Sequence, residues 1–131
     1  IQMGDCVGFA LRECARRGVA RATICAMIGK LSKIAAGHSQ THVSNSSLSS
    51  SFLAGIAAEC GAGPAAVQEI AAANTGRHFA EIVLAAGVTA VFDRLCQMAA
   101  EQCSNLVERR LAIRCILTDF EGAVLGRASV D

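Results

Sequence analysis

The order of apolar and polar residues predicts that helices and short strands alternate in the first third of the chain. Between residues 5 and 17, apolar side chains recur at the spacing of one helix face and charged residues fill the other face, which is typical of an amphipathic helix. The run 21–27 is short, apolar and β-branched, which favours a buried strand. A tight turn at Gly29 and Lys30 then leads into a second amphipathic helix over 31–36.

The remaining two thirds of the chain predict four helices and a hairpin. The helical segments show an apolar stripe and are bounded by Gly, Pro, Ser or Thr; they cover residues 48–61, 64–74, 76–86 and 89–107. The run 111–120 is again β-branched and apolar, and Glu121-Gly122 separates it from 123–125. We expect these two runs to form a β-hairpin that ends the sheet at its edge.

Together these elements indicate an α/β domain. We expect three layers, an open sheet of few strands with helices on both faces, ending in the C-terminal β-hairpin. A chain of 131 residues is about one domain, so we assign residues 1–131 to a single unit. The first helix and the strand after it are joined as in a βαβ unit whose first strand is missing, and Ile1 stands where an initiator methionine would be. The chain is therefore interpreted as a piece of a longer protein.

The balance of charges argues against two classes of partner. Twelve basic and eleven acidic residues give a net charge of +1, so no long-range field attracts nucleic acid or a membrane surface. No apolar run reaches the roughly 18 residues of a membrane-spanning helix, and the N-terminus does not read as a signal peptide. We expect a soluble, cytoplasmic protein.

Seven cysteines are an odd number, and none forms a C-x-x-C pair. Each lies among apolar neighbours, so we interpret them as small buried hydrophobic residues in a reducing compartment rather than as disulfides or a metal cluster. They are Cys6, Cys14, Cys25, Cys60, Cys96, Cys103 and Cys115.

The stretch from Arg21 to Ser44 places a polar loop after a strand and a helix. The loop after Gly37 carries two of the three histidines, His38 and His42. Ligands of open α/β sheets usually bind where strand ends meet such loops, so we expect Gly29 and His42 to share one hollow. The serine-rich segment that follows fits either the lining of that hollow or a surface linker.

Familiar nucleotide and metal motifs do not match this stretch. A phosphate-binding loop needs a glycine where Ile24 stands and a Ser or Thr where Leu31 stands, and no G-x-G-x-x-G occurs. His38 and His42 are four residues apart, but the surrounding glycine and serines favour a loop and no third ligand stands at a recognisable spacing. We therefore expect no metal site.

The order of several short motifs resembles a known family. The run IGKLSKIAAG precedes the Thr41-His42 pair, AAANT follows at 71–75, and ILTDFEGAVLG lies near the C-terminus. This arrangement resembles the C-terminal half of the cobalt-precorrin-5B C1-methyltransferases, the CbiD family of anaerobic cobalamin biosynthesis. The likeness covers nearly the whole chain, and it implies that the chain is the C-terminal part of a two-domain protein.

The resemblance implies an enzyme. It would transfer a methyl group from S-adenosylmethionine to a ring carbon, C1, of a cobalt-precorrin. The implied cofactor is S-adenosylmethionine, and the implied partner is a cobalt-corrinoid small molecule, with no nucleic acid or membrane and a possible homo-oligomer. The alternative is a non-catalytic ligand-binding or oligomerisation module of the same fold. Two departures favour that alternative: Ala26-Met27 stands where Gly-His is expected, and serines follow Thr41-His42.

Roles for individual residues follow from the resemblance. His42 is the catalytic candidate, because it could accept a proton or orient the substrate. The residues expected to contact the cofactor lie at helix junctions, and they are Gly29, Asn74 and Thr75. The residues expected to bind the substrate are suited to its acetate and propionate carboxylates; they are Lys30, Lys33, Thr41 and Arg77.

Overall fold

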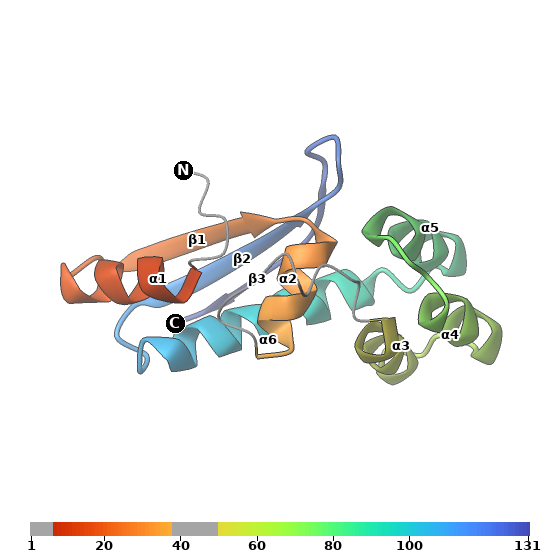
Figure 1. Cartoon of the computed structure of the whole chain (residues 1–131), viewed down its shortest axis with the longest axis horizontal. Helices are drawn as coiled ribbons and strands as arrows, with labels where there is room; N and C mark the ends of the chain where they lie inside the picture. The colour runs from red at the N-terminus through yellow and green to blue at the C-terminus, as the bar shows by residue number, and fades with distance from the viewer. Residues whose placement is uncertain (1–6, 38–49) are drawn as a thin grey trace.

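A computed structural model describes residues 7–37 and 50–131 of the protein. Helices and strands alternate early in the chain, a group of helices follows, and two strands end it (Figure 1). The elements are α1 (Val7–Arg16), β1 (Arg21–Ala26), α2 (Ile28–Ala35), α3 (Ser50–Glu59), α4 (Pro64–Ala71), α5 (Gly76–Ala86), α6 (Ala90–Leu106), β2 (Ala112–Thr118) and β3 (Val124–Val130).

The three strands form one mixed sheet in the order β1-β2-β3. β1 runs parallel to β2, with Ile24 opposite Cys115, and β2 pairs antiparallel with β3. The ladder between β2 and β3 shifts its register between Leu117 and Thr118, next to the turn. The α/β class and the C-terminal hairpin are thus confirmed, and within residues 7–37 and 50–131 β1 and β3 are the two edges of the sheet.

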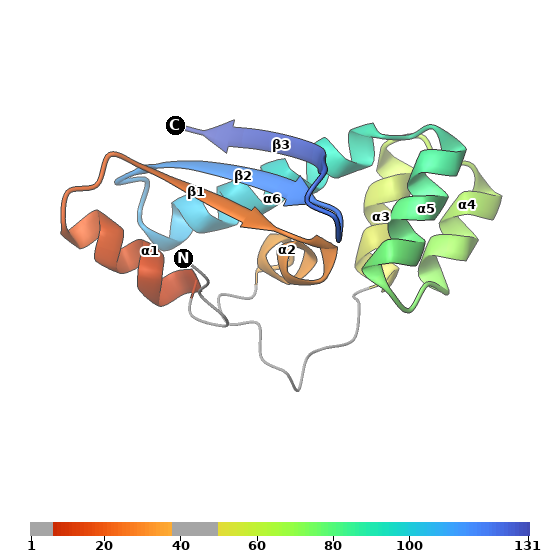
Figure 2. The same cartoon turned by 90° about the horizontal axis from the view of Figure 1, so that it is seen from above.

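The described helices cover only one face of this sheet. Along β2 the buried residues Ile113, Cys115 and Leu117 alternate with partly exposed ones, and their ladder partners on β3 point to the same side. Figure 2 shows α1, α2 and α6 beneath that side. The expected helices on both faces are therefore not found: over 7–37 and 50–131 there are two layers. The physical reason is the period of two in β2, which leaves Arg114 and Thr118 on the other face.

The longest helix, α6, packs beneath β2 and β3 and forms the floor of the core. A Cβ atom added at Gly126 would lie 2.8 Å from the carbonyl carbon of Phe92 and 2.8 Å from its Cβ, so β3 approaches the helix at a point that only glycine permits. Phe92 also meets Phe79 of α5 edge to face, with 6.3 Å between the ring centroids. This aromatic pair connects α6, which packs beneath the sheet, with α5 of the helical group.

The helices α3, α4 and α5 pack together beyond the carboxyl ends of β1 and β2 (Figure 2). α4 begins with Pro64 at its first position, as predicted, and α5 has the predicted bounds. α4 ends earlier than expected, at Ala71. This group of helices lies next to the end of the sheet at which both parallel strands finish.

Two further expectations are corrected. Gly29 and Lys30 do not form a turn, because α2 begins at Ile28 and Met27 alone links it to β1 with an extended backbone. Cys25 is exposed, since it projects from the uncovered face, whereas the cysteines of α6 and β2 are buried as predicted. Among the described residues, no helix has both the length and the apolar character needed to cross a membrane.

Candidate functional site

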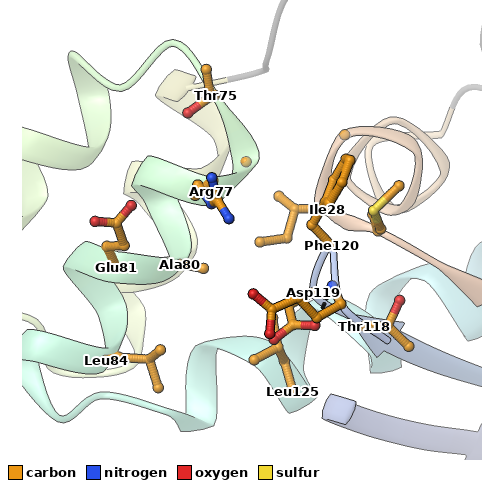
Figure 3. A pocket seen from close by; sticks show the side chains of 14 residues that line it. Ile28, Thr75, Arg77, Ala80, Glu81, Leu84, Thr118, Asp119, Phe120 and Leu125 are labelled. Atoms are coloured by element: carbon orange, nitrogen blue, oxygen red, sulfur yellow. Dashed lines mark hydrogen bonds between the residues drawn. The ribbon is translucent and has the colours of Figure 1, made fainter. Parts of the chain in front are cut away.

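A cavity of about 470 Å³ opens at the carboxyl ends of β1 and β2. Figure 3 shows α5 on one side of it, the turn between β2 and β3 on the other, and Ile28 between them. Its volume lies within the range of pockets that hold drug-sized ligands. The lining residues are Met27, Ile28, Gly29, Thr75, Gly76, Arg77, Ala80, Glu81, Leu84, Thr118, Asp119, Phe120, Glu121 and Leu125.

Two helices begin at this cavity and lie very close to each other there. A Cβ atom added at Gly76, the first residue of α5, would come within 3.1 Å of the Cβ of Ile28, the first residue of α2. The exposed backbone of Gly29 borders the same space. Both helix N-termini therefore add partial positive charge to one end of the cavity.

The α5 wall is built by a cap and a regular helix face. Thr75 caps α5, since its Oγ1 accepts a hydrogen bond from the backbone N–H of His78 at 3.1 Å. Arg77, Glu81 and Leu84 follow at spacings of four and three residues, so all three lie on the same side of the helix and line the cavity. Helical periodicity thus places a cation, a carboxylate and an apolar side chain along one wall.

The opposite wall is a turn organised by Asp119. Its Oδ1 accepts hydrogen bonds from the backbone N–H groups of Glu121 and Ala123, both at 2.9 Å. The N–H of Asp119 in turn donates to the carbonyl of Ala123 at 2.9 Å. These bonds fix the turn, and they leave Phe120 with 80% of its surface exposed beside the cavity. In Figure 3 Asp119 lies on the turn across the gap from α5.

The lining combines unequal charges with an apolar interior. Among the described residues that line it, Arg77 is the one cation, and Glu81, Asp119 and Glu121 are the three carboxylates. The remaining lining is mostly apolar, with the hydroxyls of Thr75 and Thr118 added. Such a site can orient a ligand that carries both a carboxylate and a positive charge.

The cavity brings some of the predicted site residues together. Gly29, Thr75 and Arg77 line it, although they come from two different helix starts. Asn74 is exposed and Lys30 lies in the first turn of α2, and neither belongs to the lining. Lys33 is buried within α2, with 7% of its surface exposed, and also lies outside the lining.

Thr41 and His42 fall outside the described residues, as does His38. The expected hollow shared by Gly29 and His42 therefore stays a prediction. In the parts of the chain that are described, no group of three or more His, Cys, Asp and Glu side chains is arranged to hold a metal ion.

Sequence reasoning missed the acidic side of the site. Glu81, Asp119 and Glu121 received no role, and neither did Phe120. The available signal was the position of Asp119 directly after a strand that runs parallel to β1, because the carboxyl ends of parallel strands meet at the same edge of a sheet.

Comparisons with known proteins agree on one family. The family described as CbiD, C-terminal domain, matches residues 40–129. The cobalt-precorrin-5B C(1)-methyltransferase of Leptospira interrogans is 35% identical over 127 residues, which are 97% of this chain and 35% of that protein. The protein of the same name from Pseudomonas entomophila is 38% identical over 130 residues, or 99% of this chain and 35% of that protein.

The Thermus thermophilus protein of the same name is 37% identical over 121 residues, covering 92% of this chain and 33% of its own length. The chain thus spans about a third of the length of these curated relatives. No solved structure matches it. Because the family match extends over more than half of the chain, the protein belongs to the CbiD family and corresponds to its C-terminal domain.

Proposed function

We propose that the chain is part of an enzyme that transfers a methyl group from S-adenosylmethionine to ring carbon C1 of a cobalt-precorrin in cobalamin biosynthesis. The relatives that it matches along nearly its whole length carry the name of that reaction. One structural observation supports the proposal: Gly29, Thr75 and Arg77 meet at a cavity formed where two parallel strands end.

The chemistry suits such a site. The ring carbon supplies the electron pair of the new C–C bond, and the S–CH₃ bond breaks with its pair left on sulfur. The positive charge passes to the conjugated macrocycle until a proton leaves to His42 or to solvent. Because the displacement is in line, the protein mainly has to align the two reactants and exclude water. A cavity with apolar walls and a few polar groups meets that requirement.

The residues outside the cavity keep their proposed roles. Lys30 and Lys33 on α2 are proposed to bind carboxylates of the macrocycle. Thr41 is proposed as a further substrate contact and His42 as the group that accepts a proton or orients the substrate. Asn74, next to the α5 cap, is proposed to contact the cofactor. Alanine variants of Lys30 and His42 in the full-length protein would test their roles, because unchanged turnover removes the residue from the mechanism.

Blocking the cavity tests the proposal directly. Leu84 lines the cavity and is 54% exposed, so the substitution Leu84→Trp adds bulk there without disturbing the core. The matched control is Ala85→Trp, which adds the same ring at the next, exposed position of α5 outside the lining. In the full-length protein, Leu84→Trp is expected to lower kcat/KM for methyl transfer at least about tenfold, or roughly 1.4 kcal/mol.

The control is expected to stay close to wild type in the same assay. Full activity of Leu84→Trp would show that the reaction does not use the cavity. If the wild-type full-length protein binds a ligand but transfers no methyl group, the non-catalytic module is the better assignment.

A further inference from the structure

We propose that the cavity holds the methyl donor, a sulfonium nucleoside with an amino-acid tail, and that the tetrapyrrole lies outside it against the cavity rim. This inference rests on the proposed function and assigns the two reactants to different surfaces of the same site. It also gives Arg77 a different role, which is to bind the methyl donor and not the tetrapyrrole substrate.

The charge of the lining favours the donor. Three carboxylates face one guanidinium, a formal excess of two negative charges. The donor carries a sulfonium and an ammonium group against one carboxylate, so its net positive charge complements the cavity. The tetrapyrrole carries several acetate and propionate groups, which the same carboxylates would repel. Electrostatics therefore separates the two reactants even though both are present at one site.

The size of the cavity points the same way. A volume of about 470 Å³ lies in the lower half of the range for drug-sized ligands, which suits a nucleoside with a short tail. A tetrapyrrole with all its carboxylate arms is much larger, and its ring is broad and flat. Such a ring needs a surface rather than an enclosed space.

Exposed apolar side chains gather at the rim and offer that surface. Within the described residues, six large hydrophobic side chains are exposed, and three of them, Met27, Leu84 and Phe120, belong to the cavity lining. They come from α5, from the β2–β3 turn and from the link before α2, and Figure 3 shows Leu84 and Phe120 on opposite sides of the opening. A planar macrocycle resting on this rim would cover the donor and exclude water.

The polar groups can be assigned within this arrangement. Arg77, at the end where the two helices begin, is placed to pair with the donor carboxylate through a bidentate contact. Asp119 and Glu121, on the opposite wall, are placed to face the sulfonium and ammonium groups. Ile28 and Ala80 supply apolar contacts for the base.

The reaction removes one charge from the donor, and this gives a distinctive test. After transfer, the sulfonium becomes a neutral thioether, whereas the carboxylate of the tail is unchanged. Loss of a cavity carboxylate should therefore weaken binding of the donor more than binding of the product, S-adenosylhomocysteine. Loss of Arg77 should weaken the binding of both ligands equally.

The experiment is titration calorimetry of the full-length protein with S-adenosylmethionine and with S-adenosylhomocysteine. Asp119→Asn keeps an Oδ1 acceptor for the turn while removing the charge, and Glu121→Gln removes a second charge. The double variant is expected to weaken donor binding about five- to tenfold and product binding less than about threefold. Arg77→Gln is expected to weaken the binding of both ligands to the same degree.

The matched control is Glu69→Gln, an exposed change on α4 outside the lining, which should leave both affinities unchanged. Steady-state assays complete the test, because the double variant should raise the KM for the donor and not the KM for the tetrapyrrole.

The reverse KM pattern would place the tetrapyrrole in the cavity and overturn this inference while leaving the proposed function intact. Equal loss of donor and product binding in the double variant, or no change in either KM, would also overturn it. A wild-type full-length protein that transfers no methyl group from this donor would instead overturn the proposed function.

Discussion

The two faces of the sheet differ in burial, because a helix covers one of them and the other is partly exposed. On the face that α6 covers, Leu117 and Cys115 are fully buried and Gly126 lets the helix approach the backbone. On the opposite face, Thr23 and Cys25 are exposed and Ile116 is only partly covered. Neighbouring residues of one strand therefore belong to different environments, which allows nearly matched substitutions to measure what burial contributes.

The strongest test of this contrast uses two consecutive residues of β2. Leu117→Ala removes a fully buried side chain and is expected to lower the free energy of unfolding by about 2–5 kcal/mol, because it leaves a cavity above α6. Ile116→Ala removes a similar side chain on the other face and is expected to cost about 1 kcal/mol or less. Denaturant unfolding of both variants provides the measurement. Equal losses would mean that the second face is also covered.

A smaller effect is expected at the close contact between β3 and α6. Gly126→Ala places a Cβ atom against the backbone of Phe92, so the strand or the helix has to shift, at a cost of about 1–3 kcal/mol. Ser129→Ala, exposed on the other face of the same strand, serves as control and should change stability by less than about 0.5 kcal/mol. Thermal unfolding followed by circular dichroism compares them. A neutral Gly126→Ala would show that the layers are not in close contact.

Thiol reactivity reports the same contrast without any mutation. Burial raises the pKa of the Cys96 thiol to about 11, and the hydrogen bond with Cys103 together with burial raises the pKa of the Cys115 thiol. Both thiols stay protonated at pH 8 and are shielded, whereas Cys25 is exposed. Maleimide labelling followed by peptide mass spectrometry should modify Cys25 first, and should modify Cys96 and Cys115 only after unfolding. Early labelling of Cys115 would contradict a packed helix layer.

The smallest effect is expected at the surface ion pairs of α1. The guanidinium of Arg16 hydrogen-bonds to Glu13, as does Arg17 at 2.9 Å, and together they lower the pKa of Glu13 from 4.5 to about 2. A lowered pKa adds stability that is present at neutral pH and is lost as the pH falls from about 4.5 towards 2. Because the group is in contact with solvent, Glu13→Gln should cause only a slight change at pH 7.

Unfolding measured at several pH values, with the Glu13 pKa followed by NMR titration, checks this prediction. A loss at pH 7 comparable to that of Leu117→Ala would show that surface charge, and not burial on one face, dominates stability.

Local signals predicted much of the fold. α5 has the predicted bounds because Thr75 caps its start and Gly87, at φ 71°, ends it. β3 was predicted too short, since Gly126 and Arg127 do not look like strand residues on their own. Their conformation depends on pairing with β2 and on the contact with α6, which are interactions between distant parts of the chain. The same limit explains why the one-sided covering of the sheet was missed.

The candidate site could also be predicted only where the signal is local in the sequence. Gly29 and Thr75 could be singled out because each stands next to a helix start in the sequence. Asp119 and Glu81 could not, since they reach the cavity only through the parallel pairing of β1 with β2 and the packing of α5 beyond the strand ends. A site assembled from separate elements becomes visible once the order of the strands is known.

The position of β1 at the border of the sheet has one further consequence. Over the described residues it bonds to β2 on one side only, so its other side presents main-chain donors and acceptors to any extended peptide that reaches it. Figure 2 shows β1 and β3 at opposite borders of the sheet, with β2 between them. An extended peptide that paired with β1 would widen the sheet by strand addition.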